Sequence, residues 1–227
     1  MQFSTIHGFQ DFCAALRQAG FSMGGEDGSV FSLCEWFGPE IRWHTGEPET
    51  DPWEWRIRGV TETENLAYAK VFCKKGGWIT KEWYPYFLSV RRGNSTVETL
   101  YAEGNLSRME RDLYQLVVEQ PGISLHELKM LLGIHKQEAS RFESVLTGLQ
   151  KKLFVTIHGQ SFKKNKYGEP YGWPVTTFCT TEHFFGEEPF RRAEDIPAEQ
   201  AYHAIAEQIN RLNPAAAPKE IRRFILG

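Results

Sequence analysis

The sequence predicts an α+β protein with a tryptophan-rich N-terminal part, a central block of three helices and two strands, and a helical C-terminal tail. Two observations lead to this prediction. Six of the seven tryptophans precede residue 84, whereas capped helical patterns and then strand-like runs follow residue 105. We therefore expect one module over residues 1–104, a second over residues 105–186 and a tail over residues 187–227.

The first element is an amphipathic helix over residues 9–19. Its apolar side chains recur at helical spacing, and Gly20 is placed to end the helix; these side chains are Phe9, Phe12, Cys13, Leu16 and Ala19. Residues 24–52 are rich in glycine, proline and acidic side chains, which favours ordered loops and turns.

The next segments favour strands. Residues 53–58 alternate between apolar and charged side chains, which predicts a half-buried strand with Trp53, Trp55 and Ile57 on one face. Residues 66–72 alternate more weakly, and we expect them to pair with residues 53–58 across an acidic turn. A strand and then a short helix are predicted over residues 78–87.

The central block begins with two capping boxes, in which a serine and a glutamate three residues later satisfy each other's backbone amides. They are Ser107 with Glu110 and Ser124 with Glu127. A third helix is predicted over residues 136–151, followed by strands over residues 153–157 and 175–179 joined by a basic loop. Three helices and then a strand, a loop and a strand is the order of a winged helix-turn-helix, on which the N-terminal segment is expected to pack.

Two helices are predicted in the tail, from about residue 197 to residue 214 and over residues 221–226. The chain has no run of about 18 apolar residues and no signal-peptide pattern at its start, so we expect a soluble, cytoplasmic protein with no membrane partner. Four well-separated cysteines and seven histidines show no metal-ligand spacing, and no nucleotide or cofactor motif is found. We therefore predict no metal and no cofactor.

A DNA-binding surface is predicted in the central block, because a winged helix usually places its third helix in the major groove and its hairpin along the phosphates. The exposed face of the third helix and the basic loop supply the candidates, which are Gln137, Ser140, Arg141, Ser144, Lys151, Lys152, Lys163, Lys164 and Lys166. Gly148 on the same helix face suggests close packing or a close ligand. An ordinary solvated face would have the same composition, and winged helices also dock proteins.

A second candidate site lies in the N-terminal module, where His44, Asp51, Glu54 and Arg56 fall among tryptophans. A carboxylate beside apolar rings can act as a general base, and tryptophans beside carboxylates suit an extruded nucleobase. The alternative is structural. Asp51 would then cap a turn before Pro52, Glu54 would pair with Arg56 or Arg58, and the tryptophans would be core.

These motifs resemble the bacterial AlkZ-related family. The resemblance rests on residues 43–46, 51–56, 81–86, 163–166 and 171–173, and its most specific part is Asp-Pro-Trp-Glu-Trp-Arg at residues 51–56. Members are regarded as distant relatives of the AlkZ/YcaQ winged-helix DNA glycosylases, so the resemblance implies a winged-helix architecture and a DNA-repair context. The catalytic Gln-x-Gln or Gln-x-Asp motif of those glycosylases does not occur in this sequence.

Three hypotheses follow. The first is a winged-helix protein that binds duplex DNA. The second is a nucleic-acid-modifying enzyme that uses Asp51 or Glu54 as its base. The third is a non-enzymatic module that docks another protein. The sequence leaves open whether the protein is an enzyme, which oligomeric state it has, and whether the acidic N-terminal residues mask the basic loop.

Overall fold

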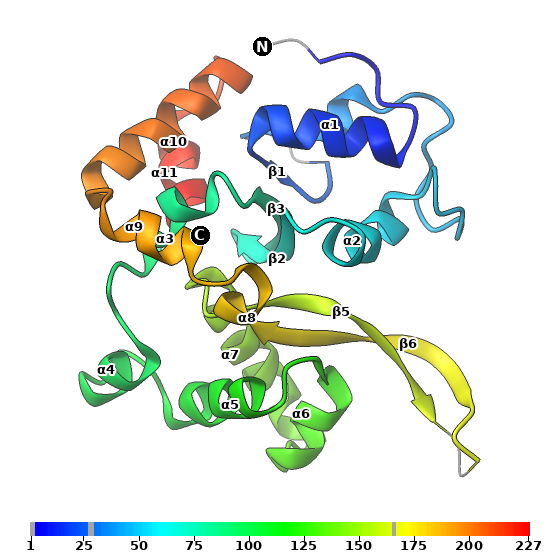
Figure 1. The fold of residues 1–227 in the computed structure, drawn as a ribbon, viewed down its shortest axis with the longest axis vertical. Coiled ribbons are helices and arrows are strands. Elements are labelled where there is room, and N and C mark those ends of the chain that lie inside the picture. The colour runs from blue at the N-terminus through cyan, green and yellow to red at the C-terminus, as the bar shows by residue number, and fades with distance from the viewer. Residues whose placement is uncertain (1–2, 27–29, 165–166) are drawn as a thin grey trace.

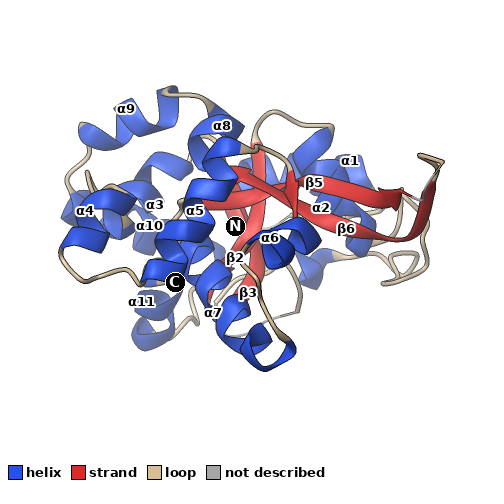
Figure 2. Cartoon of the chain, turned by 90° about the horizontal axis from the view of Figure 1, so that it is seen from below, coloured by secondary structure: helices blue, strands red, loops and turns tan. Residues whose placement is uncertain are grey.

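A computed structural model describes residues 3–26, 30–164 and 167–227 of the chain. Within these residues the fold is α+β, with two antiparallel three-stranded sheets that are covered by helices (Figures 1 and 2). The first sheet has the strand order β1–β3–β2 and the second has the order β4–β6–β5. No helix among the described residues is long and apolar enough to span a bilayer.

The first sheet belongs to the N-terminal part. Its elements are α1 (Phe9–Ala19), β1 (Phe21–Met23), the 3-10 helix η1 (Leu33–Trp36), α2 (Pro52–Thr61), β2 (Leu66–Phe72), β3 (Lys75–Thr80), α3 (Tyr84–Arg91) and α4 (Val97–Ala102). The predicted first helix is confirmed, and Gly20 ends it with a φ of 89°. The strand and the short helix predicted over residues 78–87 correspond to β3 and α3.

The predicted strand over residues 53–58 is wrong, because these residues lie in α2. Asp51 caps the helix and Pro52 occupies its first turn, two local signals that outweigh a short alternation. The buried side of α2 is formed by Pro52, Trp55, Gly59 and Val60, which is a helical spacing. The predicted pairing of residues 66–72 with this segment is also wrong. They form β2, which pairs with β3 through a two-residue turn in which Cys73 and Lys74 have positive φ.

The central block has the predicted order of elements. It consists of α5 (Arg108–Glu119), β4 (Ile123–Ser124), α6 (Leu125–Leu131), the 3-10 helix η2 (Lys136–Glu138), α7 (Ala139–Lys151), β5 (Val155–Lys164) and β6 (Pro170–Thr180). Both predicted capping boxes are present at the starts of α5 and α6. Strands β5 and β6 are longer than predicted, and their hairpin projects from the body of the molecule (Figure 1).

The remaining elements are α8 (Thr181–Phe185), α9 (Glu188–Glu194), α10 (Ala198–Leu212) and α11 (Pro218–Leu226). The two helices predicted in the tail are confirmed as α10 and α11. Helices α4, α8 and α9 were not predicted, because helices of five to seven residues have too few turns to show an apolar period.

The two halves of the chain share one apolar core. Phe72 of β2 stacks on Phe224 of α11 with ring centroids 3.8 Å apart. The guanidinium of Arg91 donates to the carbonyl oxygens of Val71, Phe224 and Ile225 at 2.7–2.8 Å and to that of Lys151 at 3.3 Å. This single side chain therefore joins the ends of α3, α7 and α11 to strand β2.

Candidate nucleic-acid interface and adjoining pocket

A pocket of about 480 Å³ lies between helix α2 and the part of the β5–β6 hairpin around Gln160 and Trp173. All four predicted catalytic residues line it, together with three residues of the hairpin, Gln160, Trp173 and Pro174. The side chains that line it include His44, Asp51, Trp53, Glu54, Arg56, Gln160 and Trp173. The structure thus brings the N-terminal candidate site against the β5–β6 hairpin, which spacing along the chain could not show.

Trp53 forms the centre of the pocket wall on α2. Its side chain is 43% exposed, unlike that of Trp55, which is 1% exposed and packs in the core. The Arg56 guanidinium lies 3.2 Å from the centroid of the Trp53 ring, and its Nε donates to the Trp53 carbonyl oxygen at 2.9 Å. The His44 ring lies 4.7 Å from the Trp53 ring. The expectation that the tryptophans are core therefore holds for Trp55 but not for Trp53.

Asp51 has a structural environment. Its carboxylate is inaccessible to solvent and accepts hydrogen bonds from the backbone N–H groups of His44, Gly46 and Trp53 at 2.8–3.0 Å. Burial acts to raise its pKa, but these backbone donors outweigh burial and hold the pKa below its ordinary value. Asp51 therefore caps α2 and fixes the loop that carries His44, whose φ is 62°. This geometry matches the structural alternative for Asp51 better than the role of a general base.

Glu54 is the accessible carboxylate of the pocket. It is partly exposed, and no hydrogen bond to its carboxylate is found among the described residues. It lies near the Arg56 guanidinium, whose pKa is lowered by burial in spite of the nearby Tyr68 hydroxyl and Glu54 carboxylate. The other arginine considered for Glu54, Arg58, pairs with Glu49 and Glu62 instead.

The hairpin supplies the opposite wall through an irregularity in β6. Ser161 pairs with Val175 and Lys163 with Tyr171, so the three residues from Gly172 to Pro174 oppose Phe162 alone. This bulge, in which Gly172 has a φ of 76°, presents Trp173 to the pocket with 90% of its surface exposed. From the sequence, residues 171–174 are compatible with a second contact or with the strand start that anchors the wing, and the structure places them within β6. Gln160 was not predicted, because an isolated glutamine carries no signal in the sequence.

The other face of the hairpin borders a different cavity. Phe162 and Tyr171 line it together with His126 and Glu127 of α6, and its volume is about 530 Å³. Phe162 is 48% exposed and Tyr171 52% exposed. Exposed aromatic side chains therefore occur on both faces of the hairpin, but only Trp173 faces α2.

Four of the predicted DNA-contacting residues lie together at the start of α7. Gln137 is in η2, and Ser140, Arg141 and Ser144 follow in α7; their spacing of three and four residues places them on one face, and all are exposed. The Ser144 hydroxyl donates to the Ser140 carbonyl oxygen.

The second half of α7 is covered by the first sheet. The Gln150 side-chain oxygen accepts a hydrogen bond from the Lys70 backbone N–H at 2.9 Å. Gly148 faces α5, because a Cβ at this position would lie 3.4 Å from the Glu110 carboxylate. The accessible part of α7 is therefore its N-terminal half.

Of the predicted lysines, Lys151 and Lys152 lie among charged side chains of the fold. Lys152 forms an ion pair with Glu110 of α5 at 3.2 Å, and Lys151 lies beside Arg91, where burial and the neighbouring cations Arg91 and Lys74 lower its pKa. The side chains of Lys163 and Lys164, and the whole of Lys166, lie outside the described residues.

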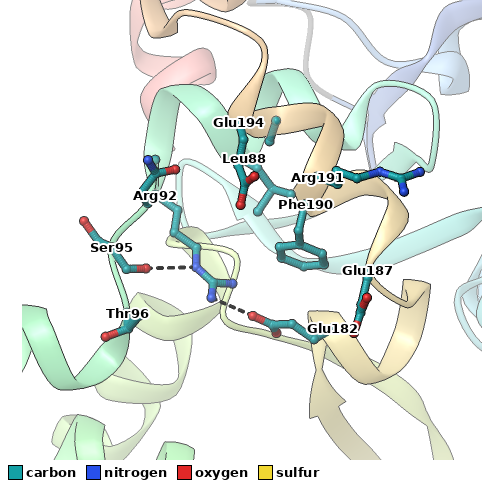
Figure 3. Close-up of a pocket in the computed structure, with 12 residues that line it drawn as sticks. Leu88, Arg92, Ser95, Thr96, Glu182, Glu187, Phe190, Arg191 and Glu194 are labelled. Atoms are coloured by element: carbon teal, nitrogen blue, oxygen red, sulfur yellow. Dashed lines mark hydrogen bonds and ion pairs between the residues drawn. The ribbon is translucent and has the colours of Figure 1, made fainter.

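A further cavity of about 520 Å³ lies between α3, α8 and α9, where Arg92 forms an ion pair with Glu182 at 2.5 Å and also donates to the Ser95 carbonyl oxygen (Figure 3). These contacts satisfy Arg92 within the fold. Among the residues that the structure describes, no group of three histidine, cysteine or acidic side chains is placed to hold a metal ion.

Comparison with known proteins defines the relationship. A family model described as AlkZ related matches residues 6–226. The chain belongs to the AlkZ-related family. Among solved structures, this AlkZ-related chain is similar to the DNA glycosylase AlkZ of Streptomyces sahachiroi, with 14% identity and a TM-score of 0.37. The match covers 79% of the present chain and 51% of that protein, so the chain spans about half of its length. No curated protein matches the chain.

Proposed function

We propose that residues 105–186 form a winged helix-turn-helix that binds duplex DNA, in a DNA-repair context. The order of elements supports this proposal, with α5, α6 and α7 as the three helices, β4 as the short strand of the sheet and the β5–β6 hairpin as the wing. Residues 1–104 and 187–227 would then be the supporting N-terminal module and tail. The repair context is supported by membership of the AlkZ-related family.

The observation that carries the proposal is the accessible N-terminal half of α7. Recognition helices contact base edges mainly through their N-terminal residues. The packing of β2 against the second half of α7 is therefore compatible with DNA recognition by its first half. Gln137 and Arg141 can form paired hydrogen bonds to bases, and Ser140 and Ser144 allow close approach. Glu143 on the same helix is neutralised by Lys129 at 3.0 Å and Lys70 at 3.8 Å.

The wing supplies the proposed phosphate contacts. Lys163, Lys164 and Lys166 are at the hairpin tip in the sequence, and a basic tip on a projecting hairpin suits the DNA backbone. Lys151 and Lys152 are left out of this proposal, because they lie among Arg91 and Glu110.

Fluorescence anisotropy with duplexes across a salt series tests the proposal. Reversing the three tip lysines should weaken binding similarly on all sequences and reduce the salt slope by about three. Arg141→Ala should alter sequence preference, whereas the matched control Arg222→Ala on α11 removes an exposed arginine away from α7 and should change nothing. Absence of binding to any duplex at low salt would overturn the proposal and favour protein docking.

A second candidate function is modification of a nucleobase with Glu54 as the general base. The accessible Glu54 carboxylate between Trp53 and the hairpin favours it, whereas the engaged Asp51 carboxylate does not. For excision of an alkylated base, Glu54 would take a proton from the water that attacks the sugar C1′ atom. The glycosidic bond would break with its electron pair passing to the cationic alkylated base, which leaves as a neutral molecule. Glu54→Gln should then abolish base release from alkylated DNA and leave duplex affinity unchanged. Unchanged release in this variant would exclude the role.

A further inference from the structure

We infer that the pocket between α2 and the β6 bulge binds one unpaired guanine base presented by DNA. This inference rests on the proposed DNA binding and specifies the ligand of the adjoining pocket. Its volume of about 480 Å³ lies within the range of roughly 300–1,000 Å³ that is typical of small-ligand sites.

The walls of the pocket are suited to a flat aromatic ligand. Trp53 on α2 and Trp173 on the hairpin contribute indole rings, and the His44 ring adjoins Trp53. The Arg56 guanidinium already occupies one face of the Trp53 ring and thereby holds it in place. Stacking on such rings is a general way to bind unpaired bases.

The exposure of Trp173 has no explanation in packing. Its side chain is 90% exposed, and no ring or cation contact to it is found within the described part of the chain. The three-residue bulge and the positive φ of Gly172 nevertheless turn this ring towards α2. Local strand irregularities often direct a side chain to a functional site, and here the bulge directs an unused stacking surface into the pocket.

The charges in the pocket favour a base over a phosphate. Among the described residues that line the pocket, Arg56 is the only arginine or lysine beside Asp51 and Glu54, so these residues offer an anion no excess of positive charge. Moreover, burial and the stacked position commit Arg56 to the Trp53 ring and carbonyl oxygen. Of the charged groups described in the pocket, the Glu54 carboxylate is the one left to recognise a ligand, and a carboxylate can only accept hydrogen bonds.

An acceptor-only carboxylate selects guanine among the four bases. The pairing edge of guanine presents two adjacent donors, N1–H and the 2-amino group, which match the two carboxylate oxygens. Adenine and cytosine place a ring acceptor beside their amino donor, and thymine has one N–H between two carbonyl groups. Gln160 lines the same pocket and has an amide that can donate to the guanine O6 atom. Because this edge is occupied in a base pair, the guanine must be unpaired.

The experiment compares duplexes that carry one bulged dG, dA, dC or dT with the fully paired duplex, by anisotropy at fixed salt. Bulged dG is expected to bind about tenfold more tightly than the paired duplex and than the other bulges. Glu54→Gln should remove the preference for dG, because an amide presents one donor and one acceptor. Trp173→Ala should lose about 5- to 100-fold of the affinity for bulged DNA. The control Phe162→Ala removes an exposed ring from the other face of the hairpin and should keep the dG preference. Circular dichroism of each variant checks folding.

Pentanucleotides with one central dG, dA, dC or dT separate this inference from the proposed function, because they need no duplex surface. Duplex binding without any gain from bulged dG, and no dG preference among pentanucleotides, overturns the inference alone. A dG preference among pentanucleotides without duplex binding overturns the proposed function alone. Loss of both overturns both, and a dG preference that survives Glu54→Gln overturns the assigned role of Glu54.

Discussion

The N-terminal part of the protein and its central block are stabilised over different distances along the chain. Helices α5 and α6 begin with capping boxes whose partners are three residues apart. By contrast, the start of α2 depends on a loop up to seven residues earlier, and α3 ends in Arg91, which bonds to carbonyl groups up to 134 residues away. The central block is therefore coded by local signals, whereas the N-terminal part depends on contacts that the fold creates.

The two regions also differ in which apolar side chains their helices bury and which they expose. Helix α5 turns its apolar side chains to the core, so its amphipathic period is clear. Helix α2 buries Trp55 but turns Trp53 outward to the pocket, and so its apolar residues alternate like those of a strand. A helix that exposes an aromatic side chain in addition to its buried side loses the simple period by which helices are recognised.

The largest expected effect tests the long-range contacts. Arg91→Met should lower the free energy of unfolding by about 3–5 kcal/mol, because it leaves four partly or fully buried carbonyl groups without this donor. Urea unfolding measures this, with Arg222→Ala on α11 as the exposed control. A loss below about 1 kcal/mol would show that the two halves of the chain do not depend on this side chain.

A smaller effect is expected at Asp51. Asp51→Ala removes an N-cap and the acceptor of three backbone N–H groups and should cost about 2–3 kcal/mol at pH 7. Because the pKa of Asp51 is lowered in the folded state, its contribution is complete above the unfolded pKa of about 4 and is lost as the pH falls through the folded value. The difference between wild type and variant in urea unfolding should therefore shrink towards pH 2. A constant difference, or an equal loss in the exposed control Glu207→Ala, would contradict this explanation.

The local caps should matter less. Ser124→Ala removes the hydroxyl that accepts from the Glu127 backbone N–H and donates to the Glu127 carboxylate at 2.6 Å. We expect a loss of about 1 kcal/mol at pH 7 in urea unfolding. The hydroxyl and backbone N–H of Ser124 lower the pKa of Glu127, so the wild-type advantage should decrease as the pH falls below about 4. A loss as large as that of Asp51→Ala would remove the contrast between the two regions.

The smallest stability effect is expected at the pocket. Trp173→Ala should change the free energy of unfolding by less than about 0.5 kcal/mol, because the ring is 90% exposed. Thermal unfolding followed by circular dichroism measures it alongside the DNA assays. A large destabilisation would show that the ring packs in solution and would remove the argument from its exposure.

The sequence by itself determined most helices of the central block and tail, because their signals lie within one or two turns. It also named four of the residues on the α2 side of the pocket, since His44, Asp51, Glu54 and Arg56 are close in the chain. It did not separate the engaged Asp51 carboxylate from the accessible Glu54 carboxylate. That distinction depends on where three backbone N–H groups point.

Only the tertiary structure decided the pairing of β2 with β3, the coverage of the second half of α7 and the composition of the pocket. Strand pairing and covering depend on contacts between segments up to 80 residues apart, as between Lys70 and Gln150. The pocket likewise joins Trp53 to Trp173 across 120 positions of the chain, and a bulge rather than a sequence period sets the direction of Trp173. Short-range periodicity carries no information about these long-range contacts, because they result from how the completed helices and strands pack.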